Sequence, residues 1–284
     1  MSIPDKTWKS QIEVYHIHAF SDVVYGGNPA GVCLLDTWLD DMALSRIARD
    51  LGPSVTAFVL AAADGTHPLR WFTRTGREVD SFCGHATFSA AHVLLRLKRL
   101  NHGKLQFLTV SGTPQVVQSG EYLSMTVPCW PVEESVCPDV LVRSIGRQPA
   151  KCYRGQRDYL LVFDTEAEVM QLRPDYNVMR ELGHEGVIAT AQRGEANIVH
   201  RFFCPGFSIA ENEDHATGSA LSSLVPYWTS RLGISEFTAH QVSARGGSFY
   251  CAIDGGVITI AAYCATFLVG TIDLGRPDRL EQRP

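Results

Sequence analysis

Two short segments far apart in the chain carry side chains that can do chemistry. Residues 81–87 hold Cys83 and His85, and residues 214–220 begin with Asp214. Each segment contains glycine and precedes an apolar run with helical spacing. A helix that begins in this way aims unpaired backbone N–H groups and the positive end of its dipole at whatever lies in front of it. Facing each other, the two segments would form a cleft for a small molecule that bears a carboxylate.

His85 and Asp214 are the main candidates for acid/base chemistry. A general acid or base must exchange a proton near neutral pH within hydrogen-bond reach of the substrate, and the usual imidazole pKa of about 6.5 allows this. Alternatively, His85 only hydrogen-bonds a substrate or the backbone. Asp214 can orient or charge-balance His85, or act as the base itself in a dry pocket. It can also cap the second helix, and these roles are compatible.

The remaining polar residues of the two segments have a chemical and a structural interpretation each. The hydroxyls of Ser219 and Thr217 and the amides near Gly218 would hold a carboxylate or stabilise an enolate-like oxyanion, or they only cap a closely packed helix. Cys83 at a helix start would have a lowered pKa that favours the thiolate, or it is a small packing residue. His215 either adds proton capacity to the site or is an exposed residue at the helix start.

Length and composition point to a folded protein that binds a small molecule. The 284 residues give room for about two domains. With 45% hydrophobic and 19% charged residues, the chain lacks the signature of disorder. A formal net charge of −5 gives no electrostatic footprint for nucleic acid, and the short basic cluster at 96–99 fits the end of a helix.

The cysteine spacing and the polar N-terminal residues indicate where the protein works and whether it needs a cofactor. The cysteines form no CxxC pair or His/Cys ladder, which argues against a metal site and a disulfide framework. There are eight of them: Cys33, Cys83, Cys129, Cys137, Cys152, Cys204, Cys251 and Cys264. No glycine-rich loop for a nucleotide is present, and residues 1–11 carry no signal-peptide core. We therefore expect a cytoplasmic protein that uses no metal or cofactor.

Alternating and helical patterns predict two helices surrounded by strands. In the first half, the predicted strands are 12–20, 30–35, 55–61, 69–73, 105–110, 114–117 and 122–127, with helices at 40–51 and 86–97. In the second half, the predicted strands are 159–163, 186–190, 198–203, 248–253 and 257–268, with helices at 175–182 and 220–232. The uncharged stretch 255–272 is rich in β-branched residues and glycine, so we expect buried strands there, not a membrane span. The proline-rich segment 128–138 is the candidate linker.

Five motifs in the same order identify a resemblance that covers nearly the whole chain. They are Gly27-Asn28-Pro29-Ala30, Ser54-Val55-Thr56-Ala57-Phe58, Arg70-Trp71-Phe72-Thr73, Cys83-Gly84-His85-Ala86-Thr87 and Glu213-Asp214-His215-Ala216-Thr217-Gly218-Ser219-Ala220. The chain resembles the PhzF family of phenazine-biosynthesis-like isomerases, which is related in fold to diaminopimelate epimerase and proline racemase.

The resemblance implies an α/β (α+β) protein with two similar domains. Each domain is a curled β-sheet or barrel wrapped around a central helix, and the active site lies in the cleft between them. We expect domains at 1–128 and 129–284, with the last strand, within 260–284, free to cross over to the first domain. The resemblance also makes a homodimer an expectation.

Family members shift a proton on a small cyclic or amino-acid-like substrate without a cofactor, using a glutamate assisted by histidine, aspartate and serine. The residues carried over are His85, Asp214 and Ser219, with Ser54, Gly84 and Gly218 beside them. The resemblance fails at one position, because the family's acid/base glutamate follows the equivalent of Ser54 and this chain has Val55 there. Valine exchanges no proton, so the inherited mechanism cannot operate unchanged and Val55 would form an apolar wall of the substrate pocket.

The expected function is a cofactor-independent isomerase that moves a proton on a small carboxylated metabolite. In the related epimerases and racemases a cysteine in this turn faces a second one, whereas here the counterpart of Cys83 is Thr217. This argues against a two-thiol racemase and leaves one-base reactions such as tautomerisation. Two alternatives stay open: a binding protein that has lost its proton donor, and a changed biosynthetic reaction such as dehydration, ring closure or rearrangement.

Overall fold

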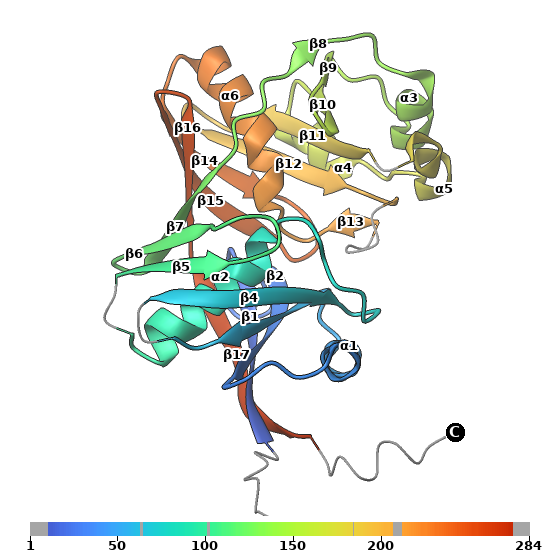
Figure 1. Ribbon diagram of the computed structural model, residues 1–284. Helices are drawn as coiled ribbons and strands as arrows, with labels where there is room; N and C mark the ends of the chain where they lie inside the picture. Colours follow the sequence, from blue (N-terminus) through green and yellow to red (C-terminus); the bar gives the residue numbers. More distant parts are fainter. Residues whose placement is uncertain (1–10, 63–64, 101–102, 184, 207–211, 275–284) are drawn as a thin grey trace, which may run out of the picture.

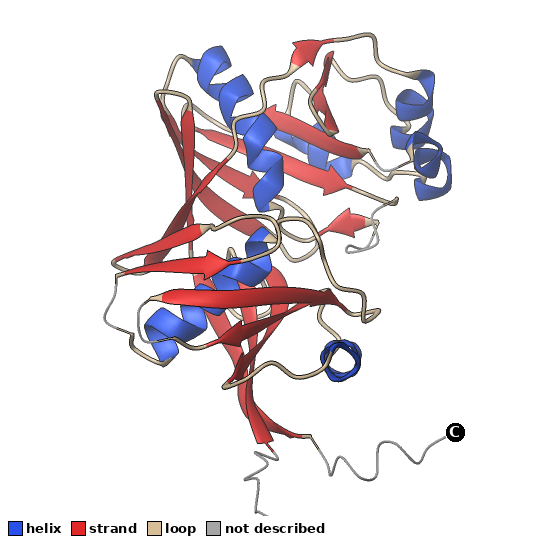
Figure 2. Ribbon diagram, in the orientation of Figure 1, coloured by secondary structure: helices blue, strands red, loops and turns tan. Residues whose placement is uncertain are grey.

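The computed structural model describes residues 11–62, 65–100, 103–183, 185–206 and 212–274, which form two stacked halves (Figures 1 and 2). Each half has a curved sheet and one principal helix packed on it, α2 (Gly84–His92) in the first and α6 (Leu221–Leu232) in the second. Two helices with strands around them were expected from the sequence. The polar N-terminal residues 1–10, and residues 275–284 of the expected crossover, lie outside the described residues.

The first half is a sheet with α2 on one face and α1 (Asp41–Leu51) on the other. Its strands follow the order β17 (Cys264–Asp273), β1 (Gln11–Ala19), β2 (Asn28–Leu35), β3 (Val55–Leu60) and β4 (Thr66–Thr73), with only β2 and β3 parallel. The ladder continues from β4 through β5 (Lys104–Leu108), β6 (Gln115–Ser119) and β7 (Tyr122–Val127). Alternate residues of β1 to β4 therefore face α2 and α1.

The second half continues the same ladder, because β7 pairs with β16 (Val257–Ala262). From β16 the order is β15 (Gly247–Asp254), β14 (Glu236–Gln241), β12 (Asn197–Phe203), β11 (Gly186–Gln192), β10 (Asp158–Val162), β9 (Lys151–Arg154) and β8 (Glu133–Glu134). The short strand β13 (Glu213–Asp214) also pairs with β12. A second apolar cluster, separate from the one around α6, lies beneath α3 (Asp139–Ile145), α4 (Glu166–Gln171) and α5 (Tyr176–Met179).

Local signals in the sequence explain where several helices begin and end. Asp40 caps α1, since its side chain accepts a hydrogen bond from the Ala43 amide at 2.7 Å. Gly52 ends α1 with φ +86°, a conformation that glycine adopts without strain. The helix predicted at 86–97 is α2 followed by a π-helical turn, η1 (Val93–Leu97).

A proline inside α6 is accommodated by the candidate linker. Pro226 has no N–H, so the carbonyl of Ser222 loses its partner within the helix. The Trp130 amide donates to this carbonyl at 2.9 Å. The segment after β7 is thus attached to α6, and it also contributes β8 to the second sheet.

The uncharged stretch near residue 260 divides between the two halves. It breaks at Tyr263, so β16 stays in the second half while β17 pairs along the whole length of β1 in the first. The expected burial is wrong for β17, where Phe267, Leu268 and Val269 are 44%, 45% and 62% exposed. The reason is that β17 is the terminal strand of the first sheet. Across the described parts of the chain, no helix is long and apolar enough to span a membrane.

One apolar core crosses the junction between the halves. Phe20, at the end of β1, has its ring centroid 5.1 Å from that of Phe88 in α2 and 4.7 Å from that of Phe249 in β15. All three side chains are fully buried. The helix starts are held together in the same region, since α2 contacts η3 (Gly218–Ala220), the turn that precedes α6.

Candidate active site

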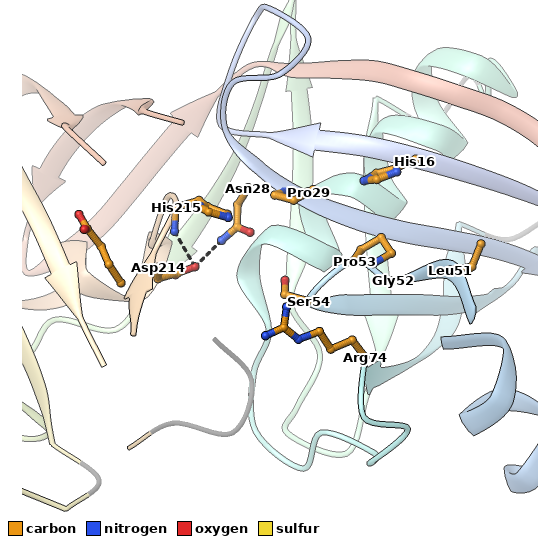
Figure 3. Close-up of a pocket in the computed structure, with 11 residues that line it drawn as sticks. His16, Asn28, Pro29, Leu51, Gly52, Pro53, Ser54, Arg74, Asp214 and His215 are labelled. Atoms are coloured by element: carbon orange, nitrogen blue, oxygen red, sulfur yellow. Dashed lines mark hydrogen bonds between the residues drawn. The ribbon is translucent and has the colours of Figure 1, made fainter. Parts of the chain in front are cut away.

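A cavity of about 200 Å³ opens between the two halves (Figure 3). The first half contributes His16 of β1, the start of β2, the end of α1 with the segment before β3, and Arg74 just after β4, and the second half contributes β13 and the turn after it. The lining residues are His16, Asn28, Pro29, Leu51, Gly52, Pro53, Ser54, Arg74, Glu213, Asp214 and His215. Predicted site residues from both halves therefore reach one cavity, namely Ser54 from the first and Asp214 and His215 from the second.

The Asp214 carboxylate is held by donors from both halves. Its Oδ1 accepts hydrogen bonds from Asn28 Nδ2 at 2.8 Å and from the His215 amide at 3.0 Å, and its Oδ2 accepts from the Thr217 hydroxyl at 2.6 Å (Figure 3). Asn28 also donates to the Ala216 carbonyl at 2.9 Å. Because Asn28 is buried at the start of β2, this contact fixes the second-half turn against the first half.

A buried glutamine supports the same turn from behind. Gln241, at the end of β14, donates to the Asp214 carbonyl at 2.7 Å and to the Thr217 hydroxyl at 3.2 Å. Its Oε1 accepts from the Thr217 amide at 2.7 Å and lies 3.0 Å from Nε2 of buried His200. Gln241 thus bonds to the turn at the Asp214 carbonyl and at both the amide and the hydroxyl of Thr217.

His85 lies in the first turn of α2, next to Ser54. Its Nε2 is 3.4 Å from the Ser54 hydroxyl, and its Nδ1 is 3.7 Å from the Cys83 sulfur. Burial lowers the pKa of His85 below 6.5, while the negative charge of Asp214 partly opposes this and the charge of His215 adds to it. The imidazole is therefore neutral at neutral pH and lies within electrostatic reach of Asp214, as the two-segment prediction requires.

Of the two alternatives for Cys83, a thiolate or a small packing residue, its burial favours the packing residue. Burial raises the pKa of the Cys83 thiol to about 12, the Ala86 amide lowers it by a smaller amount, and the negative charge of Asp214 raises it further. The side chain is only 4% exposed and belongs to the apolar core. Loss of hydration therefore outweighs the helix start, and Cys83 contacts the imidazole as a neutral thiol.

Three predicted residues of the second segment do not line the cavity. The Thr217 amide and hydroxyl are engaged by Gln241 and Asp214, as described above. The Ser219 hydroxyl accepts a hydrogen bond from Arg157 at 3.1 Å, and Arg157 forms two 2.8 Å bonds to buried Asp158. Gly218 packs near Phe20 and Ile260. Their roles in substrate binding stay predictions.

The position of the missing glutamate lies in the core. Val55 begins β3, is fully buried and belongs to the apolar cluster around α2. It is not among the cavity-lining residues. Gly84 has open space at its Cβ position, with Phe82 the nearest neighbour at 3.6 Å. Neither Val55 nor Gly84 lines the cavity, so their roles in substrate binding stay predictions.

Reasoning from sequence assigned no role to three of the residues at the cavity. Asn28 belongs to the first of the five motifs, and its partner Asp214 is remote in the chain. Arg74 directly follows another motif, and its basic side chain is the available signal. His16 lines the cavity with a buried Nε2 that has no hydrogen-bond partner among the described residues. Burial, followed by the charge of Arg245, lowers its pKa.

Within the described ranges, no group of three or more His, Cys, Asp or Glu side chains is arranged to hold a metal ion. The eight cysteines are all free thiols. The chemical groups that line the cavity are thus two imidazoles, two carboxylates, a serine hydroxyl, an amide and a guanidinium. This set suits the binding of a small polar molecule and the transfer of a proton. The predicted residue His85 does not line it and lies behind Ser54, at 3.4 Å from the serine hydroxyl.

Comparison with known proteins gives consistent relatives over nearly the whole chain. An uncharacterized isomerase of Pseudomonas aeruginosa is 39% identical over 264 residues, covering 93% of this chain and all of that protein. A human phenazine biosynthesis-like domain-containing protein is 30% identical over 290 residues, covering 92% of this chain and 99% of the relative.

Solved structures agree with the fold. The crystal structure of a PhzF-family phenazine biosynthesis protein from Enterococcus faecalis has a TM-score of 0.87 and 33% identity, covering 92% of this chain and 99% of the other. A hydroxyproline epimerase from Agrobacterium vitis has a TM-score of 0.62 at 10% identity, covering 95% of this chain and 94% of the other, and shows the fold alone. These matches confirm the expected diaminopimelate epimerase-like α/β fold.

The family assignment rests on sequence as well as on structure. The family model described as phenazine biosynthesis-like protein matches residues 17–261, which include the cavity-lining residues of both halves except His16. Several of the relatives are named isomerases. The chain belongs to the PhzC/PhzF phenazine biosynthesis-like family.

Proposed function

We propose that the protein is a cofactor-independent isomerase that transfers a proton on a small carboxylated metabolite in the cavity between its halves. The observation that supports the proposal is that His85 of the first half lies close enough to the fixed carboxylate of Asp214 in the second for the two charges to interact. Ser54 lies between His85 and the proposed substrate, since it lines the cavity and its hydroxyl is 3.4 Å from His85 Nε2.

In the proposed reaction, neutral His85 takes the proton from an acidic C–H bond of the substrate. The electron pair of that bond moves into the substrate as an enolate-like anion, and Asp214 stabilises the imidazolium. The abstracted proton exchanges with solvent on the imidazolium, which then delivers a proton to the same or another atom of the substrate anion. His85 thereby supplies acid/base capacity that Val55 cannot supply.

Proton exchange in deuterated water tests this function. The protein is incubated with a panel of cyclic and amino-acid-like carboxylates, and deuterium incorporation is followed by NMR. We expect exchange with at least one substrate, and a rate about 100-fold lower for His85→Ala. His240→Ala, at a residue that does not line the cavity, is the matched control. Equal rates for wild type and His85→Ala would refute the proposal.

A second candidate function is ligand binding without turnover, and the complete burial of Val55 at the position of the family glutamate favours it. It predicts that ligands raise the melting temperature while no proton exchanges. Val55→Glu separates the two functions: gain of exchange supports a binding protein derived from an enzyme, and loss of existing exchange supports proton transfer by the present site. Val55→Gln, similar in size but without the carboxyl proton, controls for damage to the core.

A further inference from the structure

Two of the eight cysteines, Cys137 and Cys152, lie side by side in the second half. Cys152 is in β9 and belongs to the apolar cluster beneath α3, α4 and α5, and Cys137, just before α3, packs against the same cluster. The side chains of the two thiols are joined by a hydrogen bond, and both sulfurs lie within electrostatic reach of the Tyr159 hydroxyl. Neither cysteine lines the cavity of the candidate active site.

The backbone brings the two cysteines together. The strands β8 and β9 are antiparallel, and just beyond β8 the Ser135 amide donates to the Cys152 carbonyl at 2.9 Å. The Ser135 hydroxyl is 3.8 Å from the Cys152 sulfur. Val136 follows with 92% of its surface exposed, and Cys137 then packs back onto the cluster that contains Cys152. Strand pairing on one side and the start of α3 at Asp139 on the other thus set the position of Cys137.

The two thiols differ in access from solvent. Cys152 is 5% exposed, whereas Cys137 is half-buried. Burial, then the charge and hydrogen bond of Cys152, then the charge of Asp139 raise the pKa of Cys137 to about 12. Because the thiolate is the nucleophile in thiol–disulfide exchange, the pair should react slowly at neutral pH and faster at alkaline pH. A reagent in solvent reaches Cys137 first.

We propose that Cys137 and Cys152 are an oxidation site, which a small-molecule disulfide such as glutathione disulfide converts into an intramolecular disulfide. The Cys137 thiolate attacks one sulfur of the reagent, so that a mixed disulfide forms and one glutathione thiolate leaves. The Cys152 thiolate then attacks the Cys137 sulfur, and the second glutathione thiolate leaves. The two protons of the cysteines end on the two glutathione thiolates, and the two electrons that the cysteines lose reduce the disulfide bond of the reagent.

The new bond would attach the segment between the two halves to β9. That segment, which contains Cys137, also donates from the Trp130 amide to the Ser222 carbonyl in α6. A disulfide between residues 137 and 152 encloses α3 in a covalent loop and restricts the unfolded chain. The oxidised protein should therefore be more stable than the reduced one. This inference does not depend on the proposed function, since it needs no substrate.

The test compares the reduced and oxidised forms of the full chain. The protein is incubated with excess glutathione disulfide at mildly alkaline pH, remaining thiols are blocked with iodoacetamide, and unreduced peptides are analysed by mass spectrometry. We expect a cross-linked pair of peptides that contain Cys137 and Cys152 and that separate on treatment with dithiothreitol. We also expect a melting temperature at least about 5 °C higher for the oxidised form.

Single variants identify the two steps. Cys152→Ser should accumulate the mixed disulfide between Cys137 and glutathione, because the second thiol is missing. Cys137→Ser should form no cross-link, and its melting temperature should not rise with the oxidant. Cys129→Ser, at a half-buried cysteine of the same segment between the halves, is the matched control and should leave the cross-link unchanged.

Three outcomes would overturn the inference. One is that both thiols stay unmodified in the folded protein under conditions that oxidise the urea-unfolded chain. Another is a mixed disulfide at Cys137 that persists in the wild-type protein, because Cys152 would then be out of reach. The third is a disulfide that joins either cysteine to a different one.

Discussion

The two helix starts that look alike in sequence differ in how their polar groups are used. At the start of η3 and α6, the Asp214 carboxylate, the Thr217 amide and the Thr217 hydroxyl are all engaged in short hydrogen bonds. At the start of α2, Cys83 gives no side-chain cap, and the contacts given for the His85 imidazole are long, 3.4 Å to Ser54 and 3.7 Å to Cys83. The start of α6 thus holds the Asp214 carboxylate in place by hydrogen bonds, whereas the start of α2 carries the neutral imidazole of His85.

This difference suits two separate roles at one site, proton transfer and charge stabilisation. A group that must take and release a proton benefits from weak contacts, because strong bonds would fix it in one protonation state. A group that only stabilises charge benefits from being held in place. The comparison is consistent with the proposed function, in which the first half transfers the proton and the second gives electrostatic support, and four measurements test it.

The largest effect is expected for Asp214→Ala. Removing the carboxylate leaves the Asn28 amide, the Thr217 hydroxyl and the His215 amide without their acceptor. We expect the free energy of unfolding in urea to fall by about 3 kcal/mol and proton exchange to fall by at least about 100-fold. Exposed Asp164→Ala should change stability by less than about 0.5 kcal/mol. An Asp214→Ala protein as stable as wild type would show that the hydrogen bonds to this carboxylate do not stabilise the turn.

Gln241→Leu should remove the support behind the turn. The Thr217 amide and the Asp214 carbonyl would lose buried partners, so we expect a loss of about 2 kcal/mol in urea unfolding. Exchange should fall less than in Asp214→Ala, because the carboxylate is still present. Gln192→Leu, which removes an exposed amide, is the matched control and should be nearly neutral. Equal stability of the two variants would show that the network is not needed.

The contact between His200 and Gln241 behind the turn also predicts how the free energy of unfolding depends on pH. Burial lowers the pKa of His200, which contacts Gln241, to about 3 from 6.5. Since the unfolded chain binds this proton more readily, the contribution is complete above pH 6.5 and is lost as pH falls toward 3. His200→Gln should make the fall in unfolding free energy between neutral and acidic pH shallower, by at most about 1.4 kcal/mol per pH unit. Parallel stability curves for variant and wild type would contradict this.

The smallest effect is expected at Cys83. As a buried neutral thiol it takes no part in proton transfer, so Cys83→Ala should change the exchange rate by less than about threefold and not abolish it. In the folded protein, Cys83 should also resist iodoacetamide at mildly alkaline pH, as measured by peptide mass spectrometry. Alkylation as fast as in the urea-unfolded chain would indicate an accessible, reactive thiol at Cys83 and contradict its assignment as a buried neutral thiol.

Features that depend on nearby residues were predictable from the sequence. The Asp40 cap, the glycine after α1 and the alternating strands indicate most of the elements. That His85 and Asp214 act together on one substrate stays a prediction. The organisation of the site depends on remote residues. Gln241 is a polar residue at a strand end with no local sign of its partners, and the pKa of Cys83 depends on burial by the whole first half.

The crossing of β17 has a consequence for how the molecule is made. A chain synthesised from its N-terminus produces β1 early and β17 only after the complete second half, so β1 has an unpaired edge for most of translation. Such an edge readily recruits strands from other chains. A fragment that stops after β7 would keep this liability permanently. The two halves are therefore best understood as a single cooperative unit, closed by its latest-made strand.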